Sequence, residues 1–336
     1  MSECHNVTVS ILNWNSSAVT LHAVRSVLAL QLPPHVRVNL VVVDNGSRAE
    51  DAAALADALA GLQVRLQALP QNLGFAGGHN VAIREALAKG ADFVWLLNSD
   101  AIAPPHSLAQ LLRLMDEQPR CGAASPVIVR LGQPDLVDFA GAVHDWDLLD
   151  SPRPVQTDAS RALALAHRKD FWVVGTAVLL RATALREVGL LEERYFAYYE
   201  DDDICARLAG AQWHSAMAYD AHVEHACFEG QMFERPPYYF YLMARNAFRF
   251  WGRHTPAGKR RWLRLRLLDT WLLYSNRLHS HGQPLKRDAC LLGIWDGLLG
   301  RDGPPSLQQR WTPWLLQALR LLRLPNHRPH MPSVGV

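Results

Sequence analysis

The chain has 336 residues, 49% of them hydrophobic, and a formal net charge of +2 at neutral pH. This length and composition exclude a disordered chain and leave room for one large domain or two ordinary ones. No apolar run approaches the roughly 18 residues of a membrane span, and residues 1–5 lack the features of a secretory signal. Five widely spaced cysteines suggest reduced thiols rather than a disulfide framework or a zinc site. We therefore expect a cytoplasmic protein.

The first 100 residues alternate between strand-like and helix-like patterns. Strands are predicted over 7–12, 36–43 and 64–68 and in a run that ends at Asn98, and helices are predicted through Leu32, over 49–61 and through Lys89. Such alternation is typical of a mostly parallel sheet with helices on both faces, an α/β fold. Polar residues follow three of the strands, namely Asn13, Asp44 and the triplet Asn98-Ser99-Asp100. Ligands collect at this edge of open α/β sheets, so these residues are candidate ligand contacts.

Each of these signals also has a purely structural interpretation. Asp44 would bind the edge of a nucleobase, or form an Asx turn or helix cap with Ser47. Three glycines within 72–80 would let the backbone approach a ligand at a helix start, although their spacing is not a dinucleotide fingerprint. Asp100, with Asn98, would hold a Mg²⁺ or Mn²⁺ ion that bridges a diphosphate, or would cap the following helix.

A second acidic feature lies near residue 200. Beyond about residue 171 the pattern predicts a strand-like stretch with Gly175, a helix over 182–188, the aromatic run 195–199 and a helix over 201–210 that starts in four consecutive carboxylates, Glu200 to Asp203. Adjacent carboxylates repel one another, and the aromatic residues before them argue against full solvation. We interpret this segment as the position of a general base rather than a solvated helix start. His225 follows in a strand pattern, as a ligand or as an ordinary buried histidine.

The C-terminal part of the chain is basic and helical. Helices are predicted over 238–252, 258–281, 286–299 and 313–324, and residues 251–336 carry 14 Lys and Arg against 4 Asp and Glu. We therefore divide the chain into a catalytic domain, 1–235, and a helical region, 236–330. The last helix has a polar stripe of Gln317, Arg320 and Arg323 opposite an apolar stripe of Trp314, Leu315, Leu319 and Leu322. This pattern fits a membrane surface, the catalytic domain or a second copy of the chain, and it does not indicate nucleic-acid binding.

Six motifs in this order resemble the family 2 inverting glycosyltransferases, in particular their bacterial rhamnosyltransferase-like branch. They are residues 9–15, 42–47, 72–80, 96–100, 199–207 and His225, and residues 296–301 resemble the family's C-terminal signature. The resemblance implies a GT-A fold, which is Rossmann-like, with a helical C-terminal extension. It also implies a dTDP- or UDP-sugar donor and a divalent metal, Mg²⁺ or Mn²⁺.

The resemblance also implies a role for individual residues. Asp201 matches the catalytic base, and Glu200 and Asp203 match acidic positions beside it. Asp100 and His225 match metal ligands, while Asn98 stands where the family's D-x-D element has its first Asp. The implied donor contacts are Asn13, Asp44, Asn72, Gly74, Phe75, Gly77, Asn80, Asn98, Ser99 and Asp100.

The expected activity is inverting transfer of a sugar, a deoxyhexose such as L-rhamnose, to a hydroxyl of a glycan or lipid-linked acceptor in cell-wall or other surface polysaccharide synthesis. The enzyme would work in the cytoplasm, at the inner face of the cell membrane if its C-terminal helices bind lipid, or as a homodimer if they pair. Two alternatives stay open: a non-catalytic nucleotide-sugar-binding module and a sugar-phosphate nucleotidyltransferase. The intact Glu200-Asp201 pair counts against the first, and residues 13–17, which contain no glycine and no basic residue, count against the second.

Overall fold

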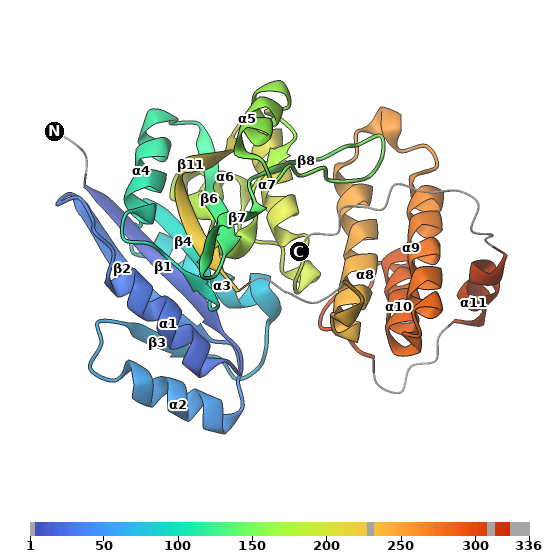
Figure 1. Ribbon diagram of the computed structural model, residues 1–336, viewed down its shortest axis with the longest axis horizontal. Helices are drawn as coiled ribbons and strands as arrows, with labels where there is room; N and C mark the ends of the chain where they lie inside the picture. The colour runs from blue at the N-terminus through green and yellow to red at the C-terminus, as the bar shows by residue number, and fades with distance from the viewer. Residues whose placement is uncertain (1–3, 227–231, 308–312, 323–336) are drawn as a thin grey trace. The chain divides into compact units, whose positions relative to one another are not determined.

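The computed structural model describes residues 4–226, 232–307 and 313–322 (Figure 1). The chain forms two compact units. The first comprises Met1–Val143, Arg153–Glu193 and Glu200–Cys227, and the second comprises His144–Pro152, Arg194–Tyr199 and Phe228–Val336. Two short segments that precede the predicted boundary at 235 thus belong with the C-terminal helices.

The first unit is built on a nine-stranded sheet in the described part of the chain. Its order is β3-β2-β1-β4-β10-β6-β11-β5, and β7 pairs with β6. The longer pairings, β1 with β2 and β4 and β6 with β11, are parallel, whereas the short strands β5 and β10 pair in antiparallel fashion. The strands are β1 His5–Asn13, β2 Val36–Asp44, β3 Arg65–Ala68, β4 Phe93–Asn98, β5 Ala101–Ile102, β6 Cys121–Arg130, β7 Gln133–Phe139, β10 Leu179–Arg181 and β11 His214–His225, and β8 Ala142–Val143 and β9 Phe171–Trp172 form a separate pair.

The strands form where the sequence predicts them because their side chains are buried on both faces of the sheet. Val9, Ile11 and Trp95 have no exposed surface, and β-branched and aromatic residues favour such positions. The Trp95 indole donates a hydrogen bond to the carbonyl of Ala177 (3.1 Å), so its one polar group is satisfied inside the core. The helices of this unit are α1 Ser17–Leu28, α2 Ala49–Leu59, α3 Gly74–Ala88, α4 Ser107–Glu117, α5 Thr157–Ala166, α6 Ala182–Val188 and α7 Glu200–Gly210.

The glycines expected in a ligand-facing loop lie inside helix α3 instead, which begins at Gly74. A Cβ at Gly78 would stand 2.4 Å from the Leu12 side chain in β1, and one at Gly77 would stand 2.7 Å from the Cβ of Leu73. Close packing of the helix on the sheet therefore explains Gly78, and contact with Leu73, the residue before the helix, explains Gly77. Gly74, with φ of +76°, supplies the left-handed residue with which the helix starts.

The second unit is helical and contains α8 Pro237–His254, α9 Leu263–Ser280, α10 Pro284–Leu299 and α11 Trp314–Leu321. Gly293 and Gly297 let α10 approach α8 closely, since a Cβ at these positions would lie 2.3 Å from the Tyr241 carbonyl oxygen and 2.9 Å from that of Arg245. Asp296, between them, accepts a hydrogen bond from the Tyr241 hydroxyl (2.7 Å). The 296–301 motif is thus part of this helix pairing.

Helix α11 does not present the predicted polar stripe to solvent. Leu316 and Arg320 are buried, and the Arg320 guanidinium donates to the Asn276 amide oxygen in α9 (3.1 Å). Trp314 is 78% exposed, and Leu321 and Leu322 are exposed as well. The helix docks through a mixed face because its arginine finds a partner there, and Arg323 lies outside the described residues. No helix in the described ranges combines the length and apolar character that a bilayer crossing needs.

Candidate active site

The polar ends of three parallel strands lie side by side at one edge of the sheet. Asn13 pairs with Asp44 in the register of β1 and β2, and Leu12 pairs with Asn98 in the register of β1 and β4. At the end of β11, His225 is opposite Ala101 of β5, which brings the histidine next to Asp100. The topology thus assembles residues from four distant parts of the sequence at the edge where ligands bind in open sheets.

Asn13 donates a hydrogen bond to the carboxylate of Asp44, the residue predicted to recognise a nucleobase. Its amide nitrogen, Nδ2, lies 3.0 Å from Asp44 Oδ1, 3.1 Å from Ser47 Oγ and 3.0 Å from Asp51 Oδ2. Ser47 also donates to Asp44 Oδ1 (2.5 Å), so Asp44 and Ser47 contact each other through their side chains. Asn13 is fully buried, and its role in the structure is to position Asp44.

Asn72 and Asn80, two of the predicted donor contacts, have different hydrogen-bond partners within the protein. The Asn72 side-chain oxygen accepts hydrogen bonds from the Gly74 N–H (2.7 Å) and from the Asn45 amide (3.1 Å). Asn80 is buried, donates to the Leu191 carbonyl (2.8 Å) and to Glu193 (2.9 Å), and accepts from the Leu191 N–H (3.1 Å). Asn45, which is not among the predicted donor contacts, ties the end of β2 to the start of α3.

Asp100 and His225, the predicted metal ligands, lie next to each other. Asp100 Oδ1 lies 3.2 Å from His225 Nε2, which in turn lies 3.4 Å from the Asn98 amide nitrogen. The Asp100 side chain is 39% exposed and that of His225 is 16% exposed, so both are accessible from solvent. The described residues contain no group of three or more His, Cys, Asp or Glu side chains that would hold a metal by themselves. One carboxylate and one imidazole fit Mg²⁺ or Mn²⁺ when diphosphate oxygens complete the coordination. Ser99, which lies between Asn98 and Asp100 in the sequence, is half-buried.

The four acidic residues at the start of α7 have different environments. Asp203 has no exposed surface and forms an ion pair with Arg207 (2.7 Å), which also donates to the backbone carbonyls of Val188 and Leu190. Burial, together with the charge of Asp201, raises the pKa of Glu200 well above its usual range. Of the three residues predicted to be catalytic, Asp203 thus has a structural partner, and the charged form of Glu200 is disfavoured by its surroundings.

Asp201 has an environment that suits proton transfer. Burial and the neighbouring Asp202 charge raise its pKa to about 7, although the Gly175 N–H donates to its carboxylate (3.0 Å). A Cβ at Gly175 would lie 3.4 Å from the Phe75 ring and 3.6 Å from Asp201 Cβ, so Phe75 and the carboxylate flank the same backbone. Gly175 begins a short 3₁₀ turn, Gly175–Ala177, that packs against β4. This contact connects Asp201 with the strand that leads to Asp100.

A strained loop directly precedes this carboxylate. Phe196, Tyr198 and Tyr199 all have left-handed backbone angles, with φ of +68°, +68° and +74°. Such angles cost of order 1 kcal/mol or more for each non-glycine residue, so other contacts must hold the loop.

Two buried residues of α8 supply those contacts. The Asn246 amide lies 3.1, 2.8 and 2.8 Å from the carbonyl oxygens of Tyr195, Ala197 and Tyr198, and Arg245 donates to the Tyr195 carbonyl (2.7 Å). The sequence analysis missed both residues. The available signal was an Arg-Asn pair in an otherwise aromatic and apolar helical stretch.

Comparison with known proteins identifies the family to which the chain is related. Residues 5–251 match the profile of the family described as glycosyltransferase like family 2. An N-acetylglucosaminyl-diphospho-decaprenol L-rhamnosyltransferase of Mycobacterium tuberculosis is 31% identical over 224 residues, which are 61% of this chain and 71% of that protein. A galactofuranosyltransferase of the same organism is 27% identical over 202 residues, 59% of this chain and 62% of that protein.

Solved structures of low sequence identity share the fold. A mannosyltransferase from Pyrobaculum calidifontis in complex with GDP-Man and Mn²⁺ superimposes with a TM-score of 0.56 at 15% identity, covering 88% of each chain. TarS 1-349 of S. aureus in complex with UDP-GlcNAc has a TM-score of 0.54 at 16% identity, covering 94% of this chain and 83% of that one. The predicted GT-A architecture is therefore confirmed.

Proposed function

The chain belongs to glycosyltransferase family 2, and on that premise we propose that it is a metal-assisted inverting transferase that uses Asp201 as its base. The observation that carries this proposal is the Asp201 carboxylate, whose pKa lies at about 7 and whose position is fixed by the Gly175 N–H. A base with a pKa near the working pH is both deprotonated often enough and basic enough to remove a proton in the transition state.

In the proposed reaction Asp201 removes the proton from an acceptor hydroxyl. The acceptor oxygen then forms a bond to the anomeric carbon while the bond from that carbon to the diphosphate breaks, on the opposite face of the sugar. The configuration is inverted, and the nucleoside diphosphate leaves with the electron pair. Asp44, held by Asn13, would accept a hydrogen bond from the nucleobase of the donor.

Asp100 and His225 are the residues that would hold the metal, together with the donor diphosphate. A divalent cation bound there would neutralise charge on the departing diphosphate. Asn98, which has an amide in place of a carboxylate, adds no negative charge at this point. We therefore propose that the cation binds weakly to the protein alone and firmly with the donor.

The choice of substrate follows the relatives. Because one relative is a rhamnosyltransferase named for a diphospho-decaprenol acceptor, we propose a lipid-linked glycan acceptor and a deoxyhexose such as L-rhamnose as the sugar. One structure of the same fold contains UDP-GlcNAc, which supports a UDP-linked donor, and the family resemblance implies a dTDP-linked donor as the other choice. The same chemistry would place the enzyme at the inner face of the cell membrane.

The first test measures release of nucleoside diphosphate from a panel of dTDP-, UDP- and GDP-sugars with Mg²⁺, Mn²⁺ or EDTA. We expect slow hydrolysis of one donor, abolished by EDTA and reduced at least tenfold by Asp100→Ala, because the variant loses one of only two protein ligands. Asp92→Ala, a substitution outside the site, serves as the control.

Three other outcomes are informative. Release that is indifferent to EDTA would rule out the metal assignment. Donor binding by calorimetry without release, even with an added lipid-linked acceptor, would favour a non-catalytic binding module. Formation of a nucleotide-sugar from a sugar phosphate and a nucleoside triphosphate would instead favour the nucleotidyltransferase.

Activity should also depend on pH through Asp201. Because the pKa of Asp201 is raised to about 7, the base becomes protonated below that pH, and turnover at saturating substrate should fall about tenfold per unit on the acid side. A pH profile of turnover between pH 5 and 9, measured alongside donor affinity, checks this expectation. A flat profile with unchanged affinity would contradict the role of Asp201.

A further inference from the structure

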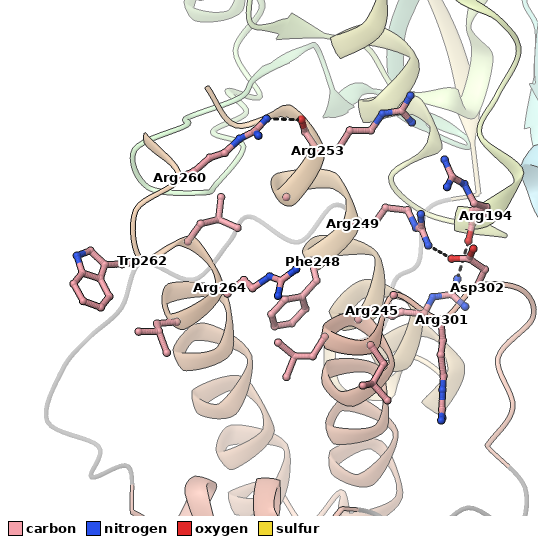
Figure 2. Close-up of a pocket in the computed structure, with 17 residues that line it drawn as sticks. Arg194, Arg245, Phe248, Arg249, Arg253, Arg260, Trp262, Arg264, Arg301 and Asp302 are labelled. Atoms are coloured by element: carbon pink, nitrogen blue, oxygen red, sulfur yellow. Dashed lines mark hydrogen bonds and ion pairs between the residues drawn. The ribbon is translucent and has the colours of Figure 1, made fainter. Parts of the chain in front are cut away.

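The second unit contains a cavity of about 890 Å³ that the proposed reaction does not use (Figure 2). It lies at the C-terminal turns of α8, the start of α9 and the end of α10. Seven arginines line it, while its only acidic lining residue among the described residues is Asp302. An enclosed surface of this composition attracts anions.

Some of these arginines contact carboxylates, and others contact uncharged backbone carbonyls. Arg249 forms an ion pair with Asp302, and Arg301 forms one with Asp296 (3.1 Å), which lies behind the lining. Arg260 donates to the backbone carbonyls of Thr255 (2.7 Å) and Arg253 (3.0 Å), and these contacts fix the guanidinium but carry no opposite net charge. Arg245 likewise donates to the backbone carbonyls of Gly303 (2.6 Å) and Tyr195 (2.7 Å), which carry no net charge. Such forked donors are suited to phosphate, which they bind through paired hydrogen bonds.

Large apolar side chains stand beside this charge. Trp262, Leu265 and Leu299 all line the cavity and are 60%, 54% and 53% exposed. Figure 2 shows Trp262 at one margin of the group of lining residues, with the pair Arg249 and Asp302 at the other. A soluble anion would make no use of exposed leucine and tryptophan. An anion attached to a hydrocarbon chain would contact both parts, and tryptophan is favoured where an apolar layer meets water.

We propose that this cavity binds the phosphate group of a membrane lipid, with Trp262 and Leu265 inserted among the adjoining apolar chains. The inference goes beyond the proposed catalytic function and does not depend on it, because it rests on a separate set of residues. It also replaces the stripe predicted for 313–324 as the main basis for membrane binding, since Arg320 of that stripe is buried.

Sedimentation of the full chain with vesicles tests the proposal. We expect binding to phosphatidylcholine vesicles that contain phosphatidylglycerol and little binding to phosphatidylcholine alone. Arg264→Glu should weaken the binding about thirtyfold, as expected for a change of two charge units at a lipid surface. Arg266→Glu is the matched control, because Arg266 is an exposed arginine of the same helix that does not line the cavity. Equal losses in the two variants would reduce the effect to general charge attraction and overturn the assignment of the cavity.

A second variant tests the proposal with a substitution that we expect to leave the fold intact. Trp262 has φ of +66°, a conformation that glycine adopts without strain, so Trp262→Gly removes the ring while keeping the backbone. We expect unchanged thermal unfolding and vesicle binding weakened at least fivefold. Undiminished binding would exclude insertion at this point.

Calorimetry with inorganic pyrophosphate distinguishes a lipid from a free anion. Weak binding of pyrophosphate that is lost in Arg264→Glu, together with strong binding of vesicles, supports the lipid site. Tight binding of pyrophosphate without sedimentation on anionic vesicles would identify a soluble phosphate ligand and overturn the lipid assignment. Neither measurement needs a sugar donor, so a negative result would leave the proposed transferase activity untouched.

Discussion

Asp201→Asn should lower turnover by about 10² or more while donor affinity stays within about twofold, because the variant keeps the shape of the side chain but cannot remove a proton from the acceptor. The Asn oxygen can still accept the hydrogen bond from the Gly175 N–H that the carboxylate accepts now. Steady-state transfer assays and calorimetric titration with the donor measure the two quantities. Turnover within a factor of three of the wild type would remove Asp201 from the mechanism.

The neighbouring residue offers a matched control for this substitution. Asp202→Asn makes the same chemical change one position along, and the Asp202 charge is one cause of the raised pKa of Asp201. Turnover at pH 8 should therefore persist in this variant, and the acid side of the pH profile should move to lower pH. Loss of turnover as large as that of Asp201→Asn would show that the two carboxylates act together.

Asp201→Asn should also make the protein more stable. The pKa of Asp201 is about 7 in the folded protein and 3.8 in the reference state, so folding is opposed by this group above pH 7, and the penalty disappears as the pH falls toward 4. An asparagine has no charge to desolvate. We expect a higher Tm for Asp201→Asn at pH 8, with the gain shrinking at pH 5.

Asn246→Ala should lower turnover at least tenfold and destabilise the fold by about 2–4 kcal/mol, because a buried donor is removed from three carbonyl groups at once. The carbonyls of Tyr195, Ala197 and Tyr198 would lose their partner, and the three left-handed residues of this loop would relax. Since Glu200 and Asp201 follow that loop directly, the base would lose its fixed position. Turnover and KM at 15 °C, together with denaturant unfolding, measure both effects.

Asn276→Ala separates positioning from simple loss of stability. Asn276 also donates its amide to a backbone carbonyl, that of Arg320 (3.0 Å), but far from the acidic segment in the chain. It should lower stability and leave turnover near that of the wild type. If destabilised Asn276→Ala loses as much turnover as Asn246→Ala, the role of Asn246 in positioning the base would be disproved.

The sequence predicted the strands and their polar ends because both depend on local patterns. Apolar runs such as the one that ends at Asn98 form buried strands, and the residue that follows each strand is fixed by the chain itself. What brings Asp100 to His225 is the pairing of β5 with β11, between residues more than 100 positions apart, which no local pattern contains. The family resemblance alone implied that Asp100 and His225 lie close together.

Other features could not be predicted, because they depend on which partner a polar side chain finds. The amide of Asn80, a predicted donor contact, donates to the Leu191 carbonyl and to Glu193. The Leu12 side chain lies where a Cβ of Gly78 would stand. In each case the decisive neighbour comes from a distant part of the sequence.

The inclusion of residues 194–199 in the helical unit limits how this enzyme can be recombined with its relatives. In a chimera joined at residue 235, Asn246 and the loop to which it donates hydrogen bonds would come from two different proteins. The contact between them would then not be matched. Exchange of the helical unit should instead transfer residues 144–152 and 194–199 together with the C-terminal segment. The segments that should be exchanged together are therefore separated in the sequence, although they form one compact unit in the structure.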